Sequence, residues 1–245
     1  MIINAKGARA YWESNVWDVS QFKPNNGGID KLSHLVLKHL KEERISNPQI
    51  IELCSGTGSL TMQILANLES LASYHCVDVN QESLSILTDS INEHDLRSGD
   101  KVVTHCGYFG EDGYTFDSLP DEADVIICCR ALHHIPNMVK FIAEASSRLR
   151  VGGAFIADII PKSERFPSLK DNYSWKAYPI ETAYLLAAGF ASLGVGSEFF
   201  TRIGLLRTNN PRSSEVNDSL HQCNLTLGYS ELDRQNHYYR FIAKK

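Results

Sequence analysis

Short apolar runs alternate with helical patterns between residues 29 and 159, and this alternation is the strongest constraint on the fold. Residues 29–44, for example, place Ile29, Leu32 and Val36 on one face at helical spacing, with charged residues opposite. Strands are predicted at 49–54, 73–78, 101–106, 123–129 and 153–159, and further helices at 58–69, 80–93, 136–149 and 179–188. Near-continuous apolar strands separated by helices predict an α/β fold, in which helices cover both faces of a parallel sheet.

The end of the chain, from residue 189 on, departs from this alternation. The segment "GFASLGVGSEFFTRI", which starts at Gly189, predicts a strand after a helix stop, and "HYYRFIAKK" predicts the last strand. The polar stretch 207–221 between them contains "TNNPRSSEVND" and predicts a loop. We expect the two terminal strands to pair as an antiparallel hairpin at the edge of the sheet.

Charge and composition argue against several classes of partner. The net charge is -5, the sequence pI is about 6.0, and no Lys/Arg cluster forms the basic patch that nucleic-acid binding requires. No apolar run reaches the roughly 18 residues of a membrane span, and the N-terminal segment lacks the apolar core of a signal peptide. The six cysteines form no CxxC pair. We therefore expect a cytoplasmic monomer or homodimer that acts on a small molecule.

A glycine turn between the first strand and the next helix points to a nucleoside cofactor. In "IELCSGTGSL", residues 51–60, Glu52 is followed by Gly56 and Gly58, and glycine here lets the backbone approach a ligand closely. Asp78 ends the second strand, where an acid accepts hydrogen bonds from a ribose diol. The third glycine of the GxGxxG dinucleotide pattern is missing, so an NAD-dependent oxidoreductase is the weaker alternative.

Several motifs between about residues 48 and 160 together resemble the class I S-adenosylmethionine-dependent methyltransferases. "IIELCSGTG" resembles the first motif of this family, "CVDVNQESL" the second, and "DVIICCRALHHIPN" the fourth-strand motif of its quinone-biosynthesis members. "LRVGGAFIADI" is similar to the start of strand five, and "AYLLAAGFASLGV" to the helix that leads into strand six. The resemblance implies a Rossmann-like, seven-stranded, mostly parallel sheet with helices on both faces and an antiparallel C-terminal strand. It implies a small N-terminal helical cap over residues 1–46, a methyltransferase domain over 47–245 and an insert at about 160–178.

The resemblance also implies which residues hold S-adenosylmethionine and its product, S-adenosylhomocysteine. Cofactor-binding roles carry over to positions at the ends of the first four strands: Glu52, Cys54, Gly56, Thr57, Gly58, Asp78, Val79, Gly107, Tyr108, Cys129 and Arg130. Two of these depart from the family pattern. Cys54 stands where the family has the first glycine of the turn, and Tyr108 stands where it often has an aspartate that contacts adenine.

Methyl transfer requires alignment of the acceptor, the methyl group and the sulfur, and an acidic acceptor also requires a base. His133 and His134 follow the fourth strand, and Asp158 ends the fifth, so these three are the candidate catalytic residues. The alternatives are that the histidines cap or pack against the following helix, and that Asp158 holds a turn. Cys128 and Cys129 lie near the histidines, but their spacing matches no common zinc pattern, so no metal is predicted.

Aromatic residues gather in two segments outside the predicted sheet. The family resemblance implies that the N-terminal segment and the insert after strand five form a lid over the acceptor. The candidate lid residues are Tyr11, Trp12, Trp17, Tyr173 and Trp175. Packing of an ordinary cap on the domain is the alternative interpretation of these aromatic side chains.

The function expected from the sequence is methyl transfer from S-adenosylmethionine to a nitrogen, oxygen or carbon atom of a small molecule. A protein that binds S-adenosylmethionine or S-adenosylhomocysteine without transferring a methyl group, or that uses the cofactor for other chemistry, is the alternative.

Overall fold

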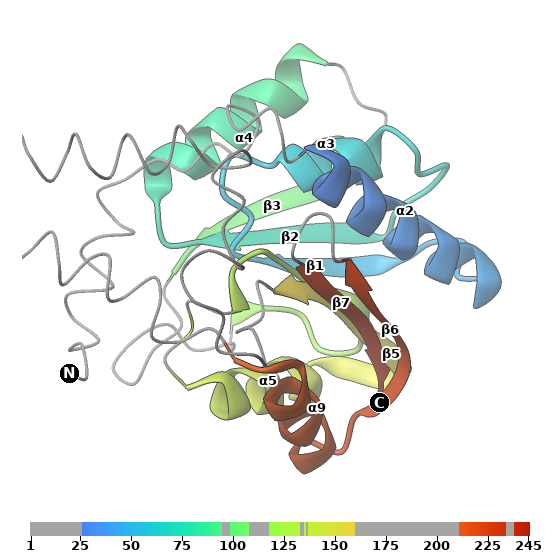
Figure 1. Cartoon of the computed structure of the whole chain (residues 1–245). Coiled ribbons are helices and arrows are strands. Elements are labelled where there is room, and N and C mark those ends of the chain that lie inside the picture. Colours follow the sequence, from blue (N-terminus) through green and yellow to red (C-terminus); the bar gives the residue numbers. More distant parts are fainter. Residues whose placement is uncertain are drawn as a thin grey trace, which may run out of the picture.

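A seven-stranded sheet organises the computed structural model, which describes residues 26–94, 99–107, 118–132, 135, 137–159, 211–233 and 238–245. Its strands lie in the order β3-β2-β1-β4-β5-β7-β6. Strands β1 to β5 pair in parallel, and β7 is antiparallel to both β5 and β6 (Figure 1). The strands are β1 (Gln49–Leu53), β2 (Ser73–Asp78), β3 (Val102–Cys106), β4 (Ala123–Cys129), β5 (Leu149–Ile159), β6 (Thr226–Asp233) and β7 (Tyr238–Lys244). The predicted mostly parallel sheet with an antiparallel C-terminal strand is confirmed.

Helices cover both faces of this sheet, as predicted (Figure 1). On one face, Leu32 of α2 and Ile64 of α3 join a buried cluster with Ile156 of β5. On the other face, Phe141 of α5 and Val216 of α9 pack into a second buried cluster. The helices are α2 (Asn26–Glu42), α3 (Ser59–Leu65), α4 (Gln81–Glu93), α5 (Met138–Ser147) and α9 (Ser213–Gln222), with a short 3₁₀ helix η3 (Gly99–Lys101). None of the described helices is both long and apolar enough to cross a membrane.

The C-terminal region differs from the sequence prediction. Residues 213–222 form α9, where the sequence predicted a loop, and the strand that pairs with β7 is 226–233. The segment predicted as strand six, 189–203, lies outside the described residues. The missed helix α9 and the misplaced partner strand of β7 have one physical cause. β6 is an edge strand with mostly exposed side chains, and α9 buries only three, so neither carries a strong apolar pattern.

The first described helix, α2, packs on the sheet close to the C-terminal hairpin. Near one end of α2, Lys31 donates to Asp233 of β6 at 2.6 Å. Past the other end, Lys244 of β7 donates to Glu43 at 2.6 Å. The helix therefore lies antiparallel to β5 and runs from the carboxyl edge of the sheet to its amino edge. The cap boundary at residue 47 stays a prediction, and most of the predicted cap and the insert at 160–178 lie outside the described residues.

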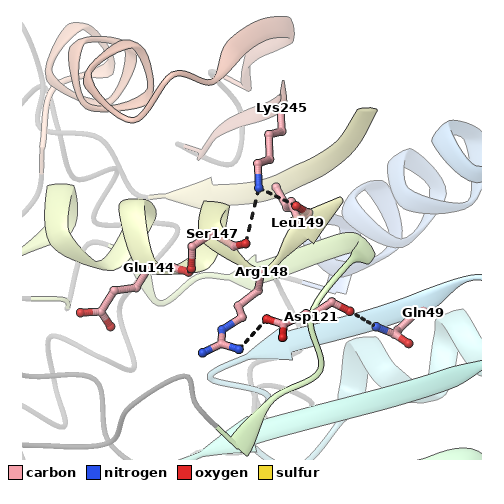
Figure 2. A network of polar contacts seen from close by, with 7 residues as sticks. All are labelled: Gln49, Asp121, Glu144, Ser147, Arg148, Leu149 and Lys245. Atoms are coloured by element: carbon pink, nitrogen blue, oxygen red, sulfur yellow. Dashed lines mark hydrogen bonds and ion pairs between the residues drawn. The ribbon is translucent and has the colours of Figure 1, made fainter. Parts of the chain in front are cut away.

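A polar network fixes the amino ends of β1, β4 and β5, at the edge opposite the glycine turn (Figure 2). Gln49 donates to the carbonyl of Asp121 at 2.8 Å, and the carboxylate of Asp121 pairs with Arg148 at 2.6 Å. Lys245 donates from Nζ to the carbonyl of Leu149 at 2.6 Å. These contacts hold strand ends in place and leave the carboxyl edge for the functional site.

Candidate cofactor and acceptor site

Three backbone positions after β1 adopt left-handed conformations. Cys54 has φ 60°, Gly56 has φ 55° and Gly58 has φ 83°. The Gly58 N–H donates to the carbonyl of Ser55 at 3.0 Å, which closes the turn before α3. A Cβ on Gly58 would lie 2.1 Å from Cδ1 of Leu87, so only glycine fits there without a shift. The left-handed conformation of Cys54 is one that glycine adopts without strain, which fits the glycine that the family resemblance led us to expect at this position.

The carboxylate of Asp78 joins the turn after β1 to the end of β2. Its Oδ2 accepts from the N–H of Gly56 at 2.8 Å, and its Oδ1 accepts from the N–H of Asn80 at 2.9 Å. The carbonyl of Asp78 accepts from the N–H of Gly107 after β3 at 2.8 Å. Burial raises the pKa of Asp78, while the N–H groups of Asn80 and Gly56 oppose that rise. Each carboxylate oxygen has a second lone pair, so Asp78 can hold the turn and also accept from a ribose hydroxyl.

Glu52 of β1 is buried beneath α3 instead of lining an open turn. Its Oε2 accepts from the hydroxyl of Tyr74 at 2.6 Å and from Oγ1 of Thr61 at 2.7 Å. Burial raises the pKa of Glu52 to about 7, against the effect of these two hydrogen bonds. Glu52 of β1 therefore links Tyr74 of β2 to Thr61 of α3.

We expect Glu52→Gln to remove a pH dependence of stability. The folded state keeps the Glu52 proton up to about pH 7, whereas an unfolded chain releases it near 4.5. Glu52 therefore contributes its full stabilisation below about pH 4.5. The free energy of unfolding falls by about 3 kcal/mol as the pH rises from there to about 7. Glutamine stays neutral, so the free energy of unfolding of the variant should rise relative to wild type between about pH 5 and pH 8. Urea titrations at both pH values measure this difference, and parallel pH curves would contradict it.

A second buried carboxylate stands at the end of β5. Asp158 is fully buried, and its Oδ1 accepts from the N–H of Arg130 at 2.7 Å. Arg130 follows β4 with φ 53°. Its N–H donates to the acid that ends β5, just as the N–H of Gly56 after β1 donates to Asp78 at the end of β2. Oδ2 of Asp158 has no hydrogen-bond partner within the described part of the chain. Burial raises the pKa of Asp158, and the nearby guanidinium of Arg130 opposes the rise.

Next to Asp158, the N-terminal end of β7 contributes a buried cation that the sequence prediction missed. Arg240 is 1% exposed and is the direct strand neighbour of Asp158. Its Nη1 donates to Asp233 at 3.0 Å, and Asp233 also accepts from Lys31. The guanidinium of Arg130 lies 4.8 Å from the centre of the Tyr238 ring, and that of Arg240 lies 5.5 Å from it. An arginine inside the apolar run 238–243 was the sequence signal for this group.

A family described as "Methyltransferase domain" matches residues 51–155, the span from β1 into β5 that includes Glu52 and Asp78. Residues 51–155, fewer than half of the residues of the chain, are therefore similar to a methyltransferase domain. No curated protein matches the sequence. Membership of the quinone-biosynthesis branch stays a prediction.

Solved structures of methyltransferases and of a cyclase share the fold of this chain at low sequence identity. An O-methyltransferase family protein from Burkholderia thailandensis has a TM-score of 0.62 and 16% identity; the match covers 91% of this chain and 57% of that one. The magnesium protoporphyrin IX methyltransferase of Synechocystis PCC 6803, with bound S-adenosylhomocysteine, has a TM-score of 0.58 and 12% identity over 97% of this chain and 91% of that one. SpnF, a (4+2)-cyclase, has a TM-score of 0.55 and 13% identity over 82% of this chain and 75% of that one.

The fold brings most of the predicted cofactor residues to one edge of the sheet. These lie at or just after the carboxyl ends of β1 to β4: Glu52, Cys54, Gly56, Thr57, Gly58, Asp78, Val79, Gly107, Cys129 and Arg130. Of the adjacent cysteines, Cys128 is buried in the core and Cys129 pairs in register with Asp158. The remaining predicted site residues lie outside the described residues: Tyr11, Trp12, Trp17, Tyr108, His133, His134, Tyr173 and Trp175. Within the described ranges, no group of three or more His, Cys, Asp or Glu side chains could hold a metal ion.

Proposed function

We propose that this chain transfers the methyl group of S-adenosylmethionine to a small-molecule acceptor. The observation that carries the proposal is the tie between the turn at Gly56 and the carboxylate of Asp78, at the carboxyl ends of neighbouring strands. In an open parallel sheet, ligands bind at this edge, where the strand order reverses. Here the reversal lies between β1 and β4, so the turn after β1 and the carboxyl ends of β4 and β5 meet at that point.

Transfer occurs in line: the acceptor atom attacks the methyl carbon, the carbon–sulfur bond breaks, and the sulfonium becomes the neutral sulfur of S-adenosylhomocysteine. The protein aligns the three atoms and accepts a proton from an acidic acceptor. Asp158 ends β5, which lies two strand spacings, about 10 Å, from β1, on the side away from β2. Its unpartnered Oδ2 supports a role in receiving that proton. His133 and His134 are further candidates for this role.

The proposal extends to the setting of the reaction. None of the six cysteines forms a disulfide, which supports a reducing, cytoplasmic compartment. We propose that the chain acts there as a monomer or homodimer, without nucleic acid or membrane as a partner. The aromatic residues Tyr11, Trp12, Trp17, Tyr173 and Trp175 are proposed to close over the acceptor.

A second candidate function has one supporting observation. SpnF shares this fold and is named a cyclase, so the fold also occurs in a protein with another reaction. Under this alternative, the chain binds S-adenosylmethionine or S-adenosylhomocysteine without transferring the methyl group.

Parallel calorimetric titrations with S-adenosylmethionine, S-adenosylhomocysteine and NAD test the proposal. We expect the first two ligands to bind with dissociation constants in the roughly micromolar range and NAD not to bind. Incubation with S-adenosylmethionine and a panel of small acceptors should then release S-adenosylhomocysteine, detected by mass spectrometry. Binding without turnover on any acceptor would favour the alternative, and binding of NAD alone would overturn both.

A further inference from the structure

Arg240 presents an unused hydrogen-bonding edge inside the protein. Its Nη1 is bonded to Asp233, but its Nε and Nη2 are buried and have no hydrogen-bond partner in the described ranges. Nε–H and Nη2–H point to the same side of a guanidinium group, which is the geometry that binds both oxygens of a carboxylate. Buried donors without partners are costly, so a group that satisfies both would stabilise the site.

The unpartnered oxygen of Asp158 lies beside this edge. Asp158 and Arg240 are paired in register on antiparallel strands, so their Cα atoms are about 5 Å apart and their side chains lie on the same face of the sheet. One small molecule can therefore contact both side chains. The two differ in what they require: Arg240 offers N–H donors, and the Oδ2 of Asp158 requires a donor or carries its own proton.

The surrounding charges favour an anion. Lys31, Arg130 and Arg240 bring three positive charges to this edge of the sheet, against the carboxylates of Asp158 and Asp233. Glu231 of β6 lies across from Arg240, but its carboxylate is at the surface, where the Tyr229 hydroxyl donates to it at 3.0 Å. Water screens an exposed charge of this kind. Lys31 is screened in the same way, because 46% of its side chain is exposed, and it shares Asp233 with Arg240. Arg240 is therefore the buried cation that a bound carboxylate would contact.

We propose that Arg240 and Asp158 select a hydroxy acid as the methyl acceptor. The carboxylate of the acceptor binds Nε and Nη2 of Arg240, and its hydroxyl donates to Oδ2 of Asp158. In the transfer step, the hydroxyl oxygen forms a bond to the methyl carbon, the carbon–sulfur bond breaks, and the hydroxyl proton passes to Oδ2 of Asp158. The products are a methyl ether and S-adenosylhomocysteine. The inference rests on the proposed function and names its substrate class.

Calorimetric titration of the full chain, with and without S-adenosylhomocysteine, tests this assignment. The probes are salicylate, salicylamide and benzoate, with glycolate and glycolamide as an aliphatic pair. In wild type, at least one hydroxy acid should bind about 10- to 100-fold more tightly than its amide, because charge-assisted hydrogen bonds contribute about 1.5–3 kcal/mol. Arg240→Gln should abolish this preference for the carboxylate. Asp158→Asn keeps an oxygen for the Arg130 N–H and should change the preference for salicylate over benzoate.

Lys244→Gln is the matched control, because it removes a cation from the far end of the same strand. This variant should keep the wild-type preference. Retained S-adenosylhomocysteine affinity in Arg240→Gln and Asp158→Asn shows that both variants are folded. If Arg240 and Asp158 only stabilise the fold, both variants lose stability and wild type shows no preference for an acid over its amide. That result overturns the inference while the proposed function stands, and absence of S-adenosylhomocysteine binding counts against the proposed function alone.

Discussion

Replacing Gly58 with alanine is expected to lower the free energy of unfolding by roughly 2–5 kcal/mol. Two physical effects add. A left-handed backbone costs a residue with a Cβ about 1–2 kcal/mol, and Gly58 has φ 83°. The new Cβ would also stand 2.1 Å from Cδ1 of Leu87, and such overpacking costs about 1–3 kcal/mol. Urea denaturation followed by circular dichroism measures the loss.

Gly152→Ala provides a matched control for the backbone effect. Gly152 has φ 79°, close to that of Gly58, but the nearest atom to its added Cβ is Nη1 of Arg150 at 3.6 Å. The difference between the two alanine variants therefore isolates the contact with Leu87. Adding Leu87→Ala to the Gly58 variant should recover part of the loss beyond the cost of the new cavity. Equal losses at Gly58 and Gly152 would show that the steric contact does not matter.

Replacing Asp78 with alanine is expected to weaken S-adenosylhomocysteine binding about 100-fold or more. The change removes the proposed acceptor for the ribose hydroxyls and also the two hydrogen bonds from the Gly56 and Asn80 N–H groups. Charge-assisted hydrogen bonds contribute about 1.5–3 kcal/mol each, so loss of one or two accounts for this factor. Calorimetry gives the affinity directly. Asp78→Asn keeps one oxygen and should lose less.

Asp124 offers the control for this experiment. Its Oδ2 accepts from the N–H of Gln49 at 2.8 Å, so it also ties β1 to a neighbouring strand, but at the amino edge of the sheet. Asp124→Ala should lower stability and leave S-adenosylhomocysteine affinity unchanged. An unaltered affinity in Asp78→Ala would end the assignment of Asp78 to the ribose, whatever happens to stability.

The central parallel strands could be predicted from the sequence. β2 and β4 have the predicted bounds, 73–78 and 123–129. β4 is a nearly continuous buried apolar run, whereas β2 carries buried Tyr74, Cys76 and Val77 among partly buried polar residues. β5 starts earlier than predicted, at Leu149, where exposed Val151 and Gly152 interrupt the apolar pattern. The edge strand β6 and the helix α9 were missed because few of their side chains are buried.

The two halves of the candidate site were predictable to different extents. The cofactor half depends on local sequence: the glycines, the strand that precedes them and the acid that ends β2 lie within 30 residues of one another. The acceptor half depends on which distant strand lies beside β5. Asp158 was a sequence candidate, but Arg240 becomes its neighbour only through the antiparallel pairing of β7, which no local pattern indicates.

The position of β7 has a consequence for the order in which the protein is completed during synthesis. β7 lies between β5 and β6, so β6 leaves the ribosome before the strand that connects it to the sheet exists. Lys31 likewise waits for Asp233, its partner 202 residues later. The nascent chain can therefore assemble the glycine turn and Asp78 early, while the Lys31, Asp233 and Arg240 group forms only at the end. A chain that stops before β7 would keep the cofactor turn and lack the acceptor-binding cation.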